Sequence, residues 1–138
     1  MKRINFLLIA VAFIIVISCS KKGSSGGNSN FWNVHYEITS TNPLTKVALT
    51  YTDSSGTEVT IGDLADTSSF VSLPWTYNAE FSKDASAIGA RYLVLGVFGS
   101  TPLPAGDKIT VKIYVDGSVV AQSDEPAFGS ITVTYKLH

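Results

Sequence analysis

Two histidines are the only side chains of this 138-residue chain that titrate near neutral pH. His35 lies within a polar-apolar alternation, and His138 is the last residue of the sequence. A Ser-His-Asp site would need one of them, and the sequence has no Gly-x-Ser-x-Gly motif. Two histidines so far apart, without supporting cysteines, make a poor zinc site. The sequence therefore predicts no catalytic residue, no metal site and no cofactor, and we expect the protein not to be an enzyme.

The eleven acidic residues offer one alternative. The closest pairs are Asp63 with Asp66 and Asp124 with Glu125, and neither has the spaced ligands of an EF-hand. Solvated loop carboxylates are the simpler interpretation of both pairs. A hydrolase would need two acids to converge in the fold and at least one to have a raised pKa.

The single cysteine, Cys19, excludes an intrachain disulfide and follows a strongly apolar segment. Lys2 and Arg3 precede an unbroken apolar run from Phe6 to Ile17, which is the arrangement of a secretory signal peptide. As a helix this twelve-residue run would be about 18 Å long, against about 30 Å of hydrocarbon in a bilayer. A transmembrane helix is therefore the weaker interpretation.

The end of the apolar run, Val16-Ile17-Ser18-Cys19, resembles the lipobox of bacterial lipoproteins. That resemblance implies lipid transfer to the Cys19 thiol, cleavage after Ser18, and acylation of the new N-terminus. Several acyl chains hold a membrane far more firmly than one. An ordinary signal peptide with an incidental cysteine is the alternative. We expect Cys19 to be a membrane anchor.

Residues 20–30 contain no apolar side chain and are rich in glycine and serine, which predicts a flexible linker. Lys21 and Lys22 would either touch anionic headgroups or remain solvated. Ser20 stands where an aspartate often retains lipoproteins at the inner membrane, so the resemblance favours the outer membrane, facing the periplasm. We therefore divide the chain into a signal peptide (1–18), the lipidated cysteine and linker (19–30), and a folded domain (31–138).

Charge separates this domain from nucleic-acid-binding proteins. Four of the ten basic residues lie before residue 31, whereas all eleven acids lie after it. The domain therefore has six basic residues against eleven acidic ones, a formal charge of −5. Binding to nucleic acid requires clustered lysine and arginine, so we expect this domain not to bind nucleic acid.

The domain has the period-two alternation of β-strands almost throughout. Turn signals separate the strands, notably Asp53-Ser54-Ser55-Gly56 and Asp116-Gly117. Pro74 suggests an edge strand or bulge, and the apolar run from Tyr92 to Phe98 suggests a central strand covered on both faces. The sequence predicts an all-β fold, an antiparallel immunoglobulin-like β-sandwich of about seven to eight strands.

Seven aromatic residues share the apolar phase of their strands, which favours core packing. They are Trp32, Tyr36, Tyr51, Trp75, Tyr77, Phe81 and Tyr135. Tyr114 and His35 lie on the outward phase and are candidate contacts for a ligand or partner. Trp75 is a third candidate, because aromatic faces stack on sugars and lipids.

Four stretches in order resemble the extracytoplasmic domain of the mycobacterial MmpS family, accessory proteins of the MmpL transporters. They are Tyr36-Glu37-Ile38, the segment Val47 to Gly56, Leu73-Pro74-Trp75, and Ile109-Thr110-Val111 continuing to Asp116-Gly117. The resemblance implies a β-sandwich on an N-terminal membrane anchor that assists export of lipids or siderophores. Family members usually have a transmembrane helix and a cysteine pair, whereas this chain has a lipobox and one cysteine.

These observations predict a lipid-anchored cell-envelope protein that binds or scaffolds an envelope partner, such as a transporter, without catalysis. The alternative is a surface module that binds a glycan or another small ligand through exposed aromatic residues.

Overall fold

The computed structural model describes residues 30–84, 92–101, 104–126 and 130–138. The predicted signal peptide, Cys19 and most of the linker lie outside the described residues. Within those residues, no helix has the length and apolar character needed to cross a membrane.

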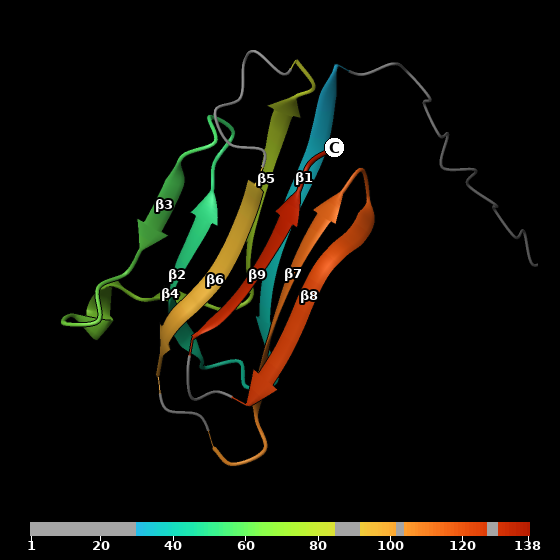
Figure 1. Ribbon diagram of the computed structural model, residues 1–138. Helices are drawn as coiled ribbons and strands as arrows, with labels where there is room; N and C mark the ends of the chain where they lie inside the picture. Colours follow the sequence, from blue (N-terminus) through green and yellow to red (C-terminus); the bar gives the residue numbers. More distant parts are fainter. Residues whose placement is uncertain (1–29, 85–91, 102–103, 127–129) are drawn as a thin grey trace, which may run out of the picture.

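The described chain forms two antiparallel sheets that pack face to face (Figure 1). The first sheet has the order β5-β1-β7-β8, and the second has the order β3-β2-β6-β9 with β4 paired to β2. The strands are β1 (Phe31–Ser40), β2 (Lys46–Thr52), β3 (Glu58–Ile61), β4 (Val71–Ser72), β5 (Trp75–Ser82), β6 (Tyr92–Ser100), β7 (Lys108–Val115), β8 (Ser118–Pro126) and β9 (Ile131–Lys136). The predicted antiparallel β-sandwich is therefore confirmed. The nine strands exceed the predicted number because the sequence did not indicate the two-residue strand β4.

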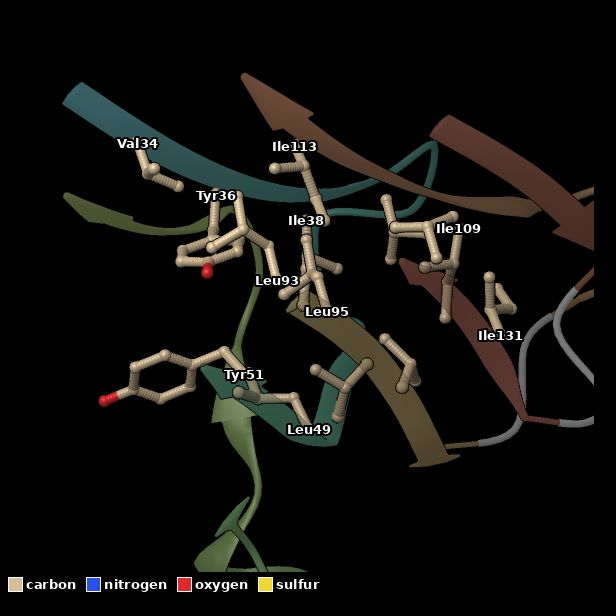
Figure 2. Packing of buried hydrophobic residues seen from close by; sticks show 14 of the residues in the cluster. Val34, Tyr36, Ile38, Leu49, Tyr51, Leu93, Leu95, Ile109, Ile113 and Ile131 are labelled. Carbon is tan, nitrogen blue, oxygen red and sulfur yellow. The ribbon is translucent and has the colours of Figure 1, made fainter. Parts of the chain in front are cut away.

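The core lies between the sheets and follows the predicted alternation. Val34, Tyr36 and Ile38 of β1 are buried, while the residues between them face outward and are half-buried. Figure 2 shows these side chains meeting those of the second sheet, including Leu49 and Leu95. Burial of aliphatic and aromatic surface from both sheets is the main force that holds them together.

Two turns follow the predicted chemistry. In the β2–β3 turn, the Asp53 carboxylate accepts hydrogen bonds from the Ser55 and Thr57 backbone N–H groups at 2.9 and 3.0 Å. In the β7–β8 turn, Asp116 and Gly117 both have positive φ, 49° and 83°, as a type I′ hairpin requires.

Pro74 marks the place where the chain leaves β4 in the second sheet and enters β5 in the first. β5 is an edge strand, as the proline suggested. β6 is central, but the expectation that both of its faces are covered is wrong at its start, where Tyr92 is 56% exposed.

The simple alternation also fails at Ala48, which faces outward from β2 and is nevertheless fully buried. The loop after β3 explains this burial, because it folds back over the outer face of the second sheet. A Cβ added to Gly62 would lie 2.9 Å from the Ala48 Cβ and 3.4 Å from the Phe70 ring. Residues 62–70, which include a 3-10 turn at Thr67–Ser69, therefore cover this part of the sheet.

Candidate binding surface

His35 and Tyr114 are neighbours on the outer face of the first sheet. Antiparallel pairing of β1 with β7 places them directly opposite each other. Their ring centroids are 5.2 Å apart, and the ring planes are tilted by 54°. The structure therefore brings together two of the three residues that the sequence suggested as contacts.

Polar side chains from the neighbouring positions hold this pair. The His35 Nδ1–H donates a hydrogen bond of 2.8 Å to Asn78 Oδ1, across the β1–β5 pairing. The Tyr114 hydroxyl donates to Glu37 Oε1 at 3.3 Å, and Lys112 Nζ lies 3.5 Å from the same carboxylate oxygen. We call these five residues the His35 patch. Strands β5, β1 and β7 each contribute to it.

The patch borders an open depression of about 280 Å³. Its lining includes Asn33, His35, Asn78, Glu80 and Gly117. Pockets that bind small molecules usually have volumes of about 300–1,000 Å³ and enclose most of the ligand. This open depression presents hydrogen-bond donors and acceptors on a sheet face and thus has the form of a contact surface.

The patch has little of the geometry that activates a general base. In Ser-His-Asp sites a carboxylate orients the imidazole and stabilises its protonated form, whereas the partner of His35 is a neutral amide. Over the part of the chain that is described, no group of three or more His, Cys, Asp or Glu residues is placed to hold a metal ion.

The acidic pairs singled out in the sequence have structural contacts. Asp66 accepts hydrogen bonds from the Ser68 backbone N–H and hydroxyl, at 3.0 and 2.6 Å, and caps the 3-10 turn. These bonds lower the pKa of Asp66, the opposite of the shift that a general acid requires. Asp124 lies 3.9 Å from Lys108 Nζ in an exposed ion pair.

Trp75 lies apart from the His35 patch, on the inward phase of β5. Its ring is nearly parallel to that of Tyr77, with an interplanar angle of 10° and centroids 6.4 Å apart. Tyr51 of the second sheet contacts both rings, at 5.2 Å from Trp75 and 4.6 Å from Tyr77. Trp75 and Tyr77 are half-buried, so the predicted core packing of these rings is incomplete.

Tyr36 lies beneath these rings and is fully buried. Its hydroxyl has no hydrogen-bond partner among the described residues. Burial raises the pKa of Tyr36 strongly, and a polar interaction with the Thr52 side chain, too poorly aligned to count as a hydrogen bond, lowers it by a smaller amount. The Thr52 hydroxyl donates to the Tyr92 carbonyl and accepts from the Val94 N–H, at 3.4 and 2.9 Å.

Sequence reasoning missed Asn78, Glu37 and Lys112 as members of the patch. Each lies on the outward phase of a strand, where a polar residue is ordinary. Their grouping depends on which strands become neighbours and in which register, and no local pattern specifies this.

No protein-family model matches this chain, and no curated protein matches it. What is established is an antiparallel β-sandwich with a polar and aromatic patch on one outer face. The resemblance to the MmpS family stays a prediction.

Proposed function

We propose that this chain is a lipid-anchored protein of the bacterial cell envelope whose β-sandwich binds a protein partner through the His35 patch, without catalysing a reaction. Cys19 would carry the lipid, and the domain would face the periplasm from the outer membrane. The MmpS-like stretches support a partner in a transport system.

The single observation behind the proposal is the arrangement of His35 and Tyr114. Both are held in place on the exposed face by neighbours on three strands, so little side-chain entropy is lost when a partner binds. Tyrosine is enriched among the residues that dominate binding energies at protein interfaces. The hydrogen bond from Nδ1 of His35 to Asn78 holds the imidazole ring in one orientation.

Site-specific photo-crosslinking in intact cells tests this proposal. A photoreactive residue at Gln122, exposed on the first sheet beside Lys112, should crosslink to one defined envelope protein. The same residue at Thr134, exposed on the outer face of the second sheet, is the matched control and should not.

The combined variant His35→Ala with Tyr114→Ala should weaken partner binding by about 30-fold, the effect of losing about 2 kcal/mol. Thr132→Ala with Thr134→Ala, on the other sheet, should leave binding unchanged. Equal crosslinking from both faces, or full binding by the His35 and Tyr114 variant, would contradict the proposal.

A second candidate function is binding of a glycan through Trp75 and Tyr77. The near-parallel orientation of their rings favours it, because sugars stack on such surfaces. Titration with neutral oligosaccharides, followed by tryptophan fluorescence, tests this candidate. A change in emission that survives Trp32→Phe and disappears in Trp75→Phe would support it, and an unchanged spectrum would count against it.

A further inference from the structure

Exposed aromatic residues lie at the end of the sandwich where the linker joins the domain. Phe31 begins β1 and is 44% exposed, and Tyr92 begins β6 and is 56% exposed. By the alternation of their strands, Phe31 lies on the outer face of the first sheet and Tyr92 on that of the second. Figure 1 shows the start of β1 and the end of β9 at this end of the molecule.

Two lysines accompany these rings. Lys83 Nζ lies 5.9 Å from the ring centroid of Trp32, and Lys136 Nζ lies 5.9 Å from that of Tyr92. Aromatic rings with long basic side chains are the residues enriched at the boundary between lipid and water. We call Phe31, Trp32, Lys83, Tyr92 and Lys136 the linker end.

The region around the linker end has a smaller net negative charge than the rest of the described domain. Four of the eleven acids lie in the turns and strand ends around it: Asp53, Glu58, Asp84 and Asp116. Elsewhere the described domain has seven acids against three lysines. The linker end is therefore the part of the domain that a membrane surface repels least, and the attraction rests on the rings more than on net charge.

The predicted linker is short enough to favour contact with the membrane. Residues 20–30 would span about 18 Å as a glycine- and serine-rich coil. A linker of this length gives an effective concentration on the order of millimolar, so even a weak contact is populated. Because the linker enters at Phe31, the linker end is the surface that it presents to the bilayer first.

We propose that the linker end docks on the phospholipid headgroup layer, so that the domain stands end-on with β1 leading away from the membrane. This inference rests on the proposed lipid anchor at Cys19. The occupant of the linker end is the membrane that carries the anchor.

The two tryptophans lie at different heights and provide the test. Trp32 pairs with Phe81 near the linker end, whereas Trp75 pairs with Ile38. Trp75 precedes Phe81 by six residues on β5, which places the two tryptophans about 20 Å apart along the strands. The full-length lipidated chain is reconstituted in vesicles of phosphatidylethanolamine and phosphatidylglycerol brominated near the headgroup. The variants Trp75→Phe and Trp32→Phe leave one tryptophan each, and bromine quenches emission only at short range.

The chain that retains Trp32 should be quenched several-fold more than the chain that retains Trp75. Adding Phe31→Ser and Tyr92→Ser to the chain that retains Trp32 should lower its quenching to that of the chain that retains Trp75. This variant should still sediment with the vesicles. Leu44→Ser is the matched control, because Leu44 is 84% exposed at the opposite end, and it should change nothing. Circular dichroism checks that each variant is folded.

Vesicle-bound protein with equal quenching at both positions, or with none, would overturn the end-on docking and leave the anchor intact. Protein that fails to sediment with vesicles would instead refute the anchor, and the inference with it.

Discussion

The buried hydroxyl of Tyr36 leads to the sharpest stability prediction. The side chain is 0% exposed, and its hydroxyl has no hydrogen-bond partner among the described residues. An unsatisfied buried hydroxyl costs about 1–3 kcal/mol. Tyr36→Phe removes it and keeps the ring that packs against Tyr51 and Tyr77. The cavity left by the oxygen, about 10 Å³, destabilises the variant by only about 0.2 kcal/mol.

We therefore expect Tyr36→Phe to raise the free energy of unfolding by about 1 kcal/mol. Urea unfolding should give a higher midpoint with an unchanged slope, and the melting temperature should rise by about 4 °C. Two control variants frame the result. Tyr51→Phe should change stability by less than about 0.5 kcal/mol, because its hydroxyl points away from the core (Figure 2). Thr52→Val should destabilise by about 1 kcal/mol, because the Thr52 hydroxyl has two partners.

Alkaline pH gives an independent measure of the same group. Burial raises the pKa of Tyr36 above its ordinary value of 10.0, so the unfolded chain loses this proton at a lower pH than the folded chain. The corresponding stability is present below about pH 10 and is lost as the pH rises further. Tyr36→Phe should flatten this decline, with a remaining slope from Tyr51, whose pKa burial also raises. Destabilisation of Tyr36→Phe by 1 kcal/mol or more would refute the reasoning and indicate a partner for the hydroxyl.

Three further predictions concern separate features of the chain. The Ser55 hydroxyl and the Thr57 backbone N–H lower the pKa of Asp53 below 3.8. The free energy of unfolding should therefore fall as the pH drops through that lowered value. In urea unfolding from pH 6 to 2, Asp53→Asn should show a smaller decline in this free energy than the unmodified protein. Gly62→Ala should cost roughly 2–3 kcal/mol of stability, because φ is +93° and the new Cβ would lie 2.9 Å from Ala48. Gly106→Ala, at φ +95° in open space, should cost roughly 1 kcal/mol. Equal losses in urea unfolding would show that the contact with Ala48 adds nothing to the backbone strain. Cys19→Ala should abolish palmitate labelling and move the protein out of the membrane fraction; an unprocessed chain that stays in the membrane would point to a transmembrane helix.

The sequence predicted those parts of the fold that depend on local alternation and turn chemistry. In the middle of β1 and β7, from Val34 to Ile38 and from Ile109 to Ile113, every second residue is apolar and buried. The Asp116-Gly117 turn has the positive φ values that its dipeptide favours. These features follow from the two-residue period of a strand and from the conformational freedom of glycine. No knowledge of distant contacts is needed to predict them.

Features that depend on distant contacts were not predictable. Ala48 is buried by a loop that follows β3, and Tyr92 is exposed although β6 is central. The candidate surface divides in the same way. The outward phase of His35 and Tyr114 followed from their own strands, but their 5.2 Å contact follows from the register between β1 and β7. That register depends on the packing of the whole core.

The two proposed surfaces are compatible because they lie at different heights on one rigid sheet. Measured along β1 at about 3.3 Å per residue, His35 lies about 13 Å from Phe31 at the linker end. End-on docking would therefore hold the His35 patch about 13 Å above the headgroups, with the outer face of the first sheet perpendicular to the membrane. A partner at this height would be the extracytoplasmic part of a protein in the same membrane. The linker alone would hold the patch at no fixed height, so loss of docking through Phe31→Ser with Tyr92→Ser should also weaken crosslinking from Gln122.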